Sequence, residues 1–248
     1  MTIHIGTAGW SLYRAREAFP AEGTVLERYA ARLNAVEINT SFYRPHQRKT
    51  YERWAASTPE DFRFAVKVPQ AITHERRLIG VADLLERFLD ETDGLGGKRG
   101  PLLIQLPPSL AFEDDRVGAF LETWRGRTDA PTVLEPRHAS WFEVEADDLL
   151  AAHRVARVAA DPAVVPAAAK PGGWRGLTYH RLHGSPVMYA SAYEAEALDA
   201  LAARLRAEAE PWCVFDNTRF GAATWDALAL KNSLSLRERE GPKRSLGG

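Results

Sequence analysis

The chain has 248 residues, of which 45% are hydrophobic, and its 32 Lys and Arg residues nearly balance 33 Asp and Glu residues. This length allows a substantial buried core and matches the roughly 250 residues of an eight-stranded α/β barrel. The near-neutral charge excludes a large field that would attract nucleic acid or an anionic membrane, so any anion site must be local. Cys213 is the single cysteine, which excludes an intramolecular disulfide and a zinc site built from cysteines.

The N-terminal stretch MTIHIGTAGW has neither the charged region nor the apolar region of a secretory signal. No apolar run approaches the roughly 20 residues that a membrane span requires. A single cysteine also fits a reducing compartment. We therefore expect a soluble, cytoplasmic protein without a membrane partner.

Short strand-like runs alternate with helical runs along the chain, which is the pattern of repeated βα units. Runs rich in Val, Ile, Leu or Phe predict eight strands, at residues 3–8, 35–39, 62–68, 101–107, 131–137, 156–161, 178–184 and 211–217. Helical periodicity lies between most of them, as at 24–33, 81–92, 113–124 and 194–209. We predict a single-domain, TIM-barrel-like parallel (β/α) barrel over residues 1–236, with an open doubly wound sheet as the alternative.

The sixth connection departs from this pattern. Its sequence PAVVPAAAKPGGW, residues 162–174, has three prolines and a glycine pair, and it predicts a long non-helical loop. Long loops in compact domains are often functional. The last residues, 237–248, have no apolar period and predict a flexible C-terminal tail.

Polar side chains recur near the C-terminal ends of the predicted strands. In AVEIN, Val36 and Ile38 share one face, which leaves Glu37 and Asn39 on the other. The same alternation assigns to the polar face Lys67, Gln105, Glu135, Arg137, Asp161, Arg181, His183 and Asn217. One buried carboxylate alone would be a structural partner for an Arg, but an α/β barrel builds its active site from these strand ends. The recurrence therefore predicts a pocket at the C-terminal face.

The loops after these strands add aromatic and titratable side chains: Trp10, Phe42, Tyr43, His74, His138, Trp141 and Trp174. Aromatic faces with fixed hydrogen-bond donors suit a sugar ring or a nucleobase. The alternative is that some Trp residues cap the barrel core, and for Trp141 both interpretations stay open. His183 is a candidate general acid or base, or a structural partner of a barrel carboxylate.

The charges expected in this ring are mixed, since Lys67, Arg137 and Arg181 accompany the carboxylates. A divalent-metal site has an excess of carboxylates and imidazoles, so interleaved cations favour an anionic ligand such as phosphate or carboxylate. The sequence has no phosphate-binding P-loop, dinucleotide fingerprint, serine-hydrolase elbow or HExxH motif. No recognised motif therefore requires a cofactor, and no metal ligands are assigned.

Seven motifs in order resemble one family: IGTAGWS, VEINTSFYR, FAVKVPQAITHERRL, LIQLPPS, LEPRHASW, YHRLHG and FDNTRFGAA. They resemble the YecE-like family, domain of unknown function 72, from Ile5 to Leu230. The resemblance implies a TIM-barrel-like fold and no agreed substrate. The family's polar positions map here onto Trp10, Glu37, Asn39, Tyr43, Lys67, His74, Gln105, Glu135, Arg137, His138, Trp141, Arg181, His183 and Asn217. Asp216 departs from the amide expected at its position.

These observations predict an enzyme that acts on a small polar or anionic ligand, such as a phosphosugar or a nucleotide-like molecule. The catalytic candidates are Glu37, Lys67, Glu135 and His183. Lys67 or His183 is expected to move a proton, and Glu37 and Glu135 are expected to orient these two side chains. Arg137 and Arg181 are expected to hold the anion. The other ligand-binding candidates are Trp10, Asn39, Tyr43, His74, Gln105, His138, Trp141 and Asn217.

Two alternatives remain. The first is a metal-dependent hydrolase or nuclease with Glu37, Glu135, Asp161 and His183 as candidate ligands. The second is a non-catalytic nucleic-acid or nucleotide-binding module that uses Arg44, Arg76 and Arg77, which the near-neutral charge does not favour. The sequence does not decide whether Lys67 is a Schiff-base nucleophile or a paired cation, and it defines no oligomeric state.

Overall fold

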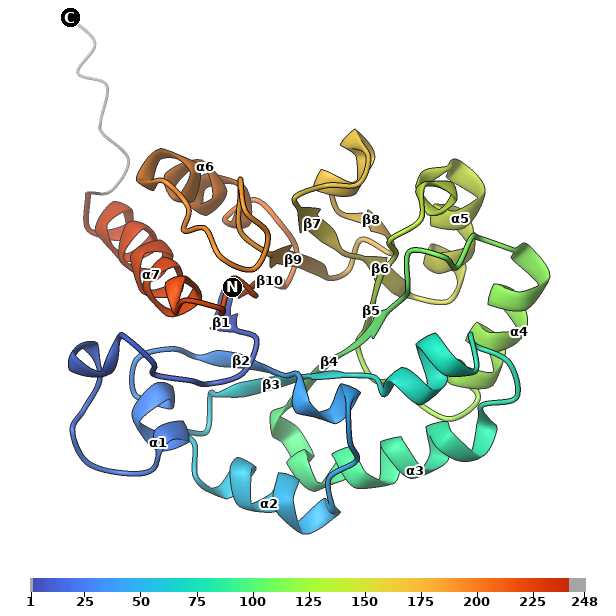
Figure 1. Ribbon diagram of the computed structural model, residues 1–248, viewed down its shortest axis with the longest axis horizontal. Coiled ribbons are helices and arrows are strands. Elements are labelled where there is room, and N and C mark those ends of the chain that lie inside the picture. Colours follow the sequence, from blue (N-terminus) through green and yellow to red (C-terminus); the bar gives the residue numbers. More distant parts are fainter. Residues whose placement is uncertain (1, 241–248) are drawn as a thin grey trace, which may run out of the picture.

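Strands form the centre of the structure and helices cover their outer side (Figure 1). The computed structural model describes residues 2–240, without the side chains of 236–240. The strands are β1 (His4–Thr7), β2 (Ala35–Ile38), β3 (Arg63–Lys67), β4 (Arg99–Gln105), β5 (Thr132–Glu135), β6 (Val155–Arg157), β7 (Ala159–Asp161), β8 (Gly172–Gly173), β9 (Thr178–Leu182) and β10 (Pro211–Phe215).

The strands follow one another in a nearly continuous parallel order. One sheet has the strand order β1-β10-β9-β7 and the other has the order β2-β3-β4-β5-β6-β8. In the second sheet, the short β8 pairs antiparallel with β6. An isolated parallel bridge between Ala8 and Glu37 connects β1 to β2. Val158 alone separates β6 from β7, and its N–H donates to Leu134 O at 2.9 Å. This order is that of a TIM-barrel-like ring, and the predicted fold class is confirmed.

Helices lie between most successive strands, as the periodicity predicts, but the described stretch from β6 to β9 has no α-helix. They are α1 (Val25–Ala30), α2 (Arg48–Ala56), α3 (Ala82–Thr92), α4 (Asp114–Arg125), α5 (Val144–Ala152), α6 (Ala195–Leu205) and α7 (Ala222–Glu240). The start of α1 shows the local cause: the Thr24 hydroxyl accepts from the Glu27 N–H, and the Glu27 carboxylate accepts from the Thr24 N–H at 2.6 Å. This capping box satisfies two amides that the helix itself leaves without partners.

Two apolar layers hold the strands in place. Inside the ring, the small Ala35 and Ala65 lie in one cluster with the large Tyr179 and Trp212. On the other face of the strands, side chains such as Phe64 join a larger core with the helices. Alternation along each strand supplies both layers, because successive side chains face opposite ways.

The sixth connection is more ordered than the predicted non-helical loop. Pro166–Ala169 form one turn of 3₁₀ helix, η6, and Gly172–Gly173 form β8. Arg157 explains this order, because its Nη1 donates to the carbonyl oxygens of Ala167 and Lys170 at 3.3 and 3.4 Å. The prolines exclude a long α-helix here, but contacts distant in sequence shape the segment.

The C-terminal helix α7 runs to Glu240, past the predicted end of the domain at residue 236. The rest of the predicted tail, 241–248, lies outside the described residues. Over the part of the chain that is described, no helix has the length and apolar character needed to cross a membrane.

Gly6 marks a close approach of β1 to β2, since an added Cβ would overlap the carbonyl oxygen of Ala35. We expect Gly6→Ala to lower the free energy of unfolding by about 1–3 kcal/mol, because packed backbone cannot yield easily. Gly118, in α4, is the matched control: nothing lies within 4 Å of its added Cβ. Gly118→Ala should instead stabilise the protein by about 0.5–1 kcal/mol. Urea unfolding checks both variants, and a destabilisation of equal size in the two would contradict the argument.

Candidate functional site

A buried ion-pair cluster lies where the strands end, and Arg181 of β9 is its centre. Arg181 Nε and Nη2 donate to the two oxygens of Glu37 at 2.9 and 2.7 Å, and Nη1 donates to Glu135 Oε2 at 2.8 Å. Nη2 also lies 3.2 Å from Asp216 Oδ2. Arg181, Glu37 and Glu135 are each 0% exposed. The two-pronged guanidinium thus accounts for the carboxylate inside β2, since it matches a carboxylate bidentately.

His183 joins two of these carboxylates. Its Nε2 lies 2.9 Å from Glu135 Oε1 and its Nδ1 lies 3.0 Å from Asp216 Oδ2. Burial opposes the charged imidazole, but Glu135 and Asp216 outweigh burial and raise the pKa of His183. Both ring nitrogens therefore donate to carboxylates when His183 is protonated.

The same contacts lower the pKa values of the carboxylates Glu135 and Asp216. Burial disfavours the charged form of Glu135, but Arg181, His183 and Arg137 hold its pKa well below the ordinary value. Burial likewise opposes the charge of Asp216, and Arg181 and His183 lower its pKa. Arg137 completes the set, with Nη2 2.7 Å from Glu135 Oε1, while its buried Nε has no hydrogen-bond partner among the described residues. The cations Arg181 and His183 and the carboxylates Glu135 and Asp216 thus favour one another's charged forms.

Lys67, at the end of β3, differs from the other cations of the site. It is 6% exposed, and no carboxylate of residues 2–235 lies within 4.0 Å of its Nζ. Nζ instead lies 4.0 Å from the centre of the Phe42 ring, a cation–π contact. Burial first, and then Arg181, lower the pKa of Lys67 to about 8 against the opposing pull of the carboxylates. A neutral amine is therefore accessible near physiological pH.

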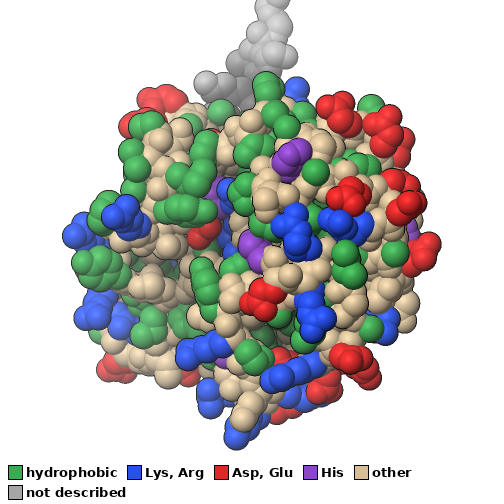
Figure 2. Space-filling model, turned by 45° about the vertical axis from the view of Figure 1, so that its right-hand side comes forward, with side chains coloured by type: hydrophobic (Ala, Val, Ile, Leu, Met, Phe, Trp, Pro, Cys, Tyr) green, Lys and Arg blue, Asp and Glu red, His purple; other side chains and the backbone are tan. Residues whose placement is uncertain are grey.

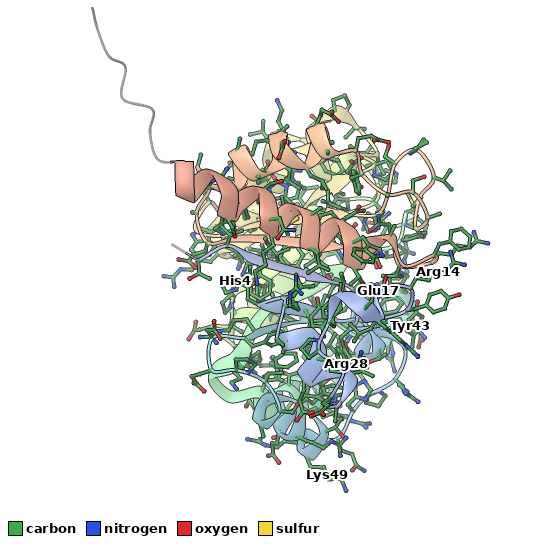
Figure 3. The ribbon with its side chains drawn as sticks, turned by 90° about the vertical axis from the view of Figure 1, so that its left-hand side faces the viewer. His4, Arg14, Glu17, Arg28, Tyr43 and Lys49 are labelled. Carbon is green, nitrogen blue, oxygen red and sulfur yellow. The ribbon has the colours of Figure 1, made fainter. Side chains whose placement is uncertain are left out.

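Two further rings lie beside the Phe42 ring that contacts this amine. The Phe42 ring contacts Tyr43 and His74 edge to face, each with ring centres 5.0 Å apart. His74 is half-buried on the π-helical turn η3 (Ala71–Glu75), a type of turn frequent at functional sites. Burial and then Lys67 lower the pKa of His74, which favours the neutral imidazole. Tyr43 is 69% exposed and projects from the edge of the molecule where Arg14 also projects, while His4 lies nearer the opposite edge (Figure 3).

The structure brings five predicted residues into contact with one another: Glu37, Glu135, Arg137, Arg181 and His183. Lys67 lies near enough for Arg181 and the carboxylates to influence its pKa. Gln105 pairs in register with Glu135 and is half-buried. Asn39 has a buried Oδ1 without a partner in the described part of the chain. Gln105 thus ends β4 beside Glu135 of the neighbouring strand β5, and Asn39 directly follows β2, which contains Glu37.

Other predicted residues have structural partners. His138 Nδ1 accepts from the Ser140 N–H at 3.2 Å and caps the short helix η5 (Ala139–Phe142). Trp10 packs edge-on against Trp54 of α2 with ring centres 5.0 Å apart. Trp141 is 0% exposed and its Nε1 donates to Leu110 O at 2.9 Å, so it belongs to the core.

Two face assignments are wrong by one residue. Asn217 lies outside the cluster, since its Nδ2 donates to Ser191 O and Asp226 Oδ2 at 2.7 Å each. Asp216 takes the expected place, because Val214 and not Phe215 faces the inside of the ring. In β7, Ala160 is the residue paired with Arg181, so Asp161 falls beside Leu182.

The structure also corrects the expectations for Arg181 and Trp174. Arg181 is engaged by three carboxylates and closed to solvent, so it organises the site and cannot receive an external anion. Trp174 lies in a cavity of about 260 Å³ with His4 and Trp212, near the starts of the strands. It is therefore at the other end of the ring from the cluster.

Over the described residues, no three or more His, Cys, Asp and Glu side chains are arranged to hold a metal ion. The chemical reason is visible in the contacts, since Arg181, Arg137 and His183 already face the carboxylates of the cluster. Cations in these positions repel a divalent ion.

Sequence comparison places these features in a family. A family model described as "Protein of unknown function DUF72" matches residues 4–246. The UPF0759 protein YecE of Escherichia coli K12 is 32% identical over 120 residues, which cover 48% of this chain and 43% of YecE. The UPF0759 protein YunF of Bacillus subtilis 168 is 31% identical over 150 residues, covering 56% of this chain and 52% of YunF. The matches thus span about half the length of these curated relatives.

Solved structures agree on the fold. A DUF72 family protein of Enterococcus faecalis V583 superposes with a TM-score of 0.79 at 21% identity, covering 94% of this chain and 96% of its own. A DUF72 family protein of Thermotoga maritima MSB8 superposes with a TM-score of 0.78 at 24% identity, covering 95% and 100%. Because the family model matches residues 4–246, nearly the whole chain, the chain belongs to the DUF72 family.

Proposed function

We propose that this chain is an enzyme that binds a small anionic ligand, such as a phosphosugar or a nucleotide-like molecule, at the C-terminal ends of its strands. One observation carries the proposal: the mostly buried Lys67 has no carboxylate within 4.0 Å among the described side chains, whereas Arg181 and Arg137 are paired. A buried, unpaired cation is costly, and an anionic ligand would offset that cost.

The neighbours of Lys67 support catalysis as well as binding. With a pKa of about 8, Lys67 can exchange a proton near neutral pH, and the neutral His74 beside Phe42 is a second acid–base group. Arg137 Nε, which is buried and has no partner among the described residues, would be an additional donor for the ligand. The face shown in Figure 2 has a central hollow, with Lys, Arg and His side chains and also acidic ones beside it.

The two rival functions have less support. A metal-dependent hydrolase needs ligands that the cluster uses for internal ion pairs, and Asp161 lies outside the cluster. Of the three arginines expected for a nucleic-acid module, Arg77 is engaged within the protein, since it donates to Ser109 Oγ and Ser109 O at 3.0 and 2.8 Å. The balanced total charge also argues against a large phosphate footprint.

Thermal-shift measurements with inorganic phosphate and glucose 6-phosphate test the proposal. At a concentration of 100 times Kd, a ligand specific for the native state stabilises it by about 2.7 kcal/mol, which is a visible shift in Tm. Lys67→Met should abolish the shift, and it should remain folded because Met is a similarly long side chain that replaces a buried, unpaired charge with an apolar group. The matched control is Lys49→Met, since Lys49 is exposed on α2 and projects from the lower edge in Figure 3.

The outcomes separate the three functions. A phosphate-induced shift in the native protein and in Lys49→Met, but not in Lys67→Met, supports the anion pocket. The same shift in Lys67→Met contradicts it. Stabilisation by divalent metal alone would favour the hydrolase, and salt-sensitive stabilisation by oligonucleotides alone would favour the binding module.

A further inference from the structure

We propose that Lys67 forms a covalent imine with a small acidic carbonyl compound, either a 2-oxo acid or a phosphorylated aldehyde or ketone. This inference rests on the proposed anion pocket and specifies its substrate class. Its geometric basis is the position of Nζ, which lies on the face of the Phe42 ring with no carboxylate of the described residues within 4.0 Å. With no direct ion pair among the described residues, the protonated nitrogen is favoured by the Phe42 ring and by carboxylates farther than 4.0 Å away, and these do not outweigh burial.

The other lysines lack this combination. Lys98 Nζ is partly buried and donates to Ala55 O and Thr58 O at 2.8 and 2.7 Å, so its protons are committed. Lys231 Nζ donates to Arg32 O. Lys49 and Lys170 are exposed, where water stabilises the ammonium. Within the described part of the chain, Lys67 alone joins burial to a free nitrogen.

The surroundings of Lys67 meet the known requirement for a nucleophilic lysine, which is desolvation next to another cation. Burial and the nearby Arg181 are the two largest influences that disfavour its charge, while Glu37, Glu135 and Asp216 oppose them. His74 is the titratable group that faces Lys67 from the following turn. These groups belong to five different strands or the turns after them, so the fold fixes the environment of the amine.

The reaction balances without an oxidant or a reductant. The neutral Nζ attacks the carbonyl carbon, and the carbonyl oxygen takes up a proton to give a carbinolamine. Nitrogen then expels this oxygen as water, so the amine and the carbonyl compound yield an imine and one water molecule. His74, which packs on the same Phe42 ring, is placed to carry the protons. The acidic group of the substrate would pair with Arg137, whose side chain is 11% exposed.

Reductive trapping tests this inference on the full chain. The protein is incubated with glyoxylate or with dihydroxyacetone phosphate in the presence of cyanoborohydride, which reduces an iminium ion and spares the free carbonyl. Peptide mapping then assigns the adduct among the six lysines, Lys49, Lys67, Lys98, Lys170, Lys231 and Lys243. We expect labelling at Lys67 to be at least about tenfold faster than at the exposed Lys49, because the pKa of Lys67 is lowered to about 8 and the proposed anion pocket holds the carbonyl compound beside it.

Lys67→Arg separates this inference from the proposed function. Arginine keeps the positive charge but forms no imine under these conditions, so the variant should retain the phosphate-induced thermal shift and lose the adduct. A phosphate shift that depends on the charge at position 67, with no adduct in the native protein, would overturn the imine and leave the anion pocket standing. Labelling spread evenly over exposed lysines would also overturn the imine. The absence of both adduct and phosphate shift would overturn the two proposals together.

Discussion

Arg181→Met is expected to lower the free energy of unfolding by about 3–5 kcal/mol, because a buried carboxylate that loses its cation becomes strongly unfavourable. The variant leaves Glu37 without both of its guanidinium hydrogen bonds and removes the Arg181 partner of Glu135. Both carboxylates are 0% exposed, so water cannot replace the lost donors. Urea unfolding monitored by tryptophan fluorescence measures the change.

Arg48→Met is the matched control for this substitution. Arg48 pairs with Asp90 at 3.0 Å, but the two side chains are 49% and 71% exposed, and such surface pairs contribute at most about 1 kcal/mol. Similar losses in the two variants would contradict the role assigned to Arg181. The double variant Arg181→Met with Glu37→Met should recover part of the loss, because it removes a carboxylate together with its cation.

Arg181 also influences the amine that we propose to be functional. Its charge is the largest influence after burial that lowers the pKa of Lys67. The same guanidinium pairs with Glu37 and Glu135, which would otherwise raise that pKa further. Arg181 thus acts as a positioning residue: it keeps the carboxylates from forming an ion pair with Lys67.

The order and kind of the main elements follow from local patterns in the sequence. Apolar strand runs and helical periodicity predict the ring of βα units, because both depend on the spacing of side chains along a few residues. The small elements η6 and β8 have another cause. Arg157 donates to the Ala167 and Lys170 carbonyl oxygens, and the Gly173 N–H donates to Asp147 Oδ1 at 3.0 Å. Contacts between such distant residues have no signature in a short stretch of sequence.

The sequence predicts which residues lie together in the candidate site better than it predicts what each of them does there. Alternation places Glu37, Glu135 and Arg181 together, and the structure shows their hydrogen bonds. It fails at Asp216, where counting inward positions from Trp212 and Val214 would have identified the correct face. It also cannot show that Arg181 has no donor to spare for a ligand, since that depends on distances and burial.

The same cluster predicts how stability depends on pH. The folded-state pKa values of Glu135 and Asp216 lie below the ordinary values of 4.5 and 3.8. The stability that these carboxylates contribute is therefore present above those values and is lost as the pH falls through the folded-state pKa values. His183 has a folded-state pKa above 6.5, so its contribution is complete below 6.5 and is lost as the pH rises through the folded-state pKa. All three contributions coexist between 4.5 and 6.5.

His183→Gln isolates the alkaline side of this profile. We expect the native protein to lose stability above pH 6.5 relative to the variant, because glutamine cannot titrate, while both lose stability in acid. His4 and His74 have lowered pKa values and act in the opposite sense, but they are common to both proteins and cancel in the difference. His153→Gln, at the end of α5 and outside the cluster, is the control and should follow the native profile. Urea unfolding at a series of pH values gives the difference in the free energy of unfolding between the two proteins. If this difference is the same below and above pH 6.5, His183 does not hold its proton between the two carboxylates.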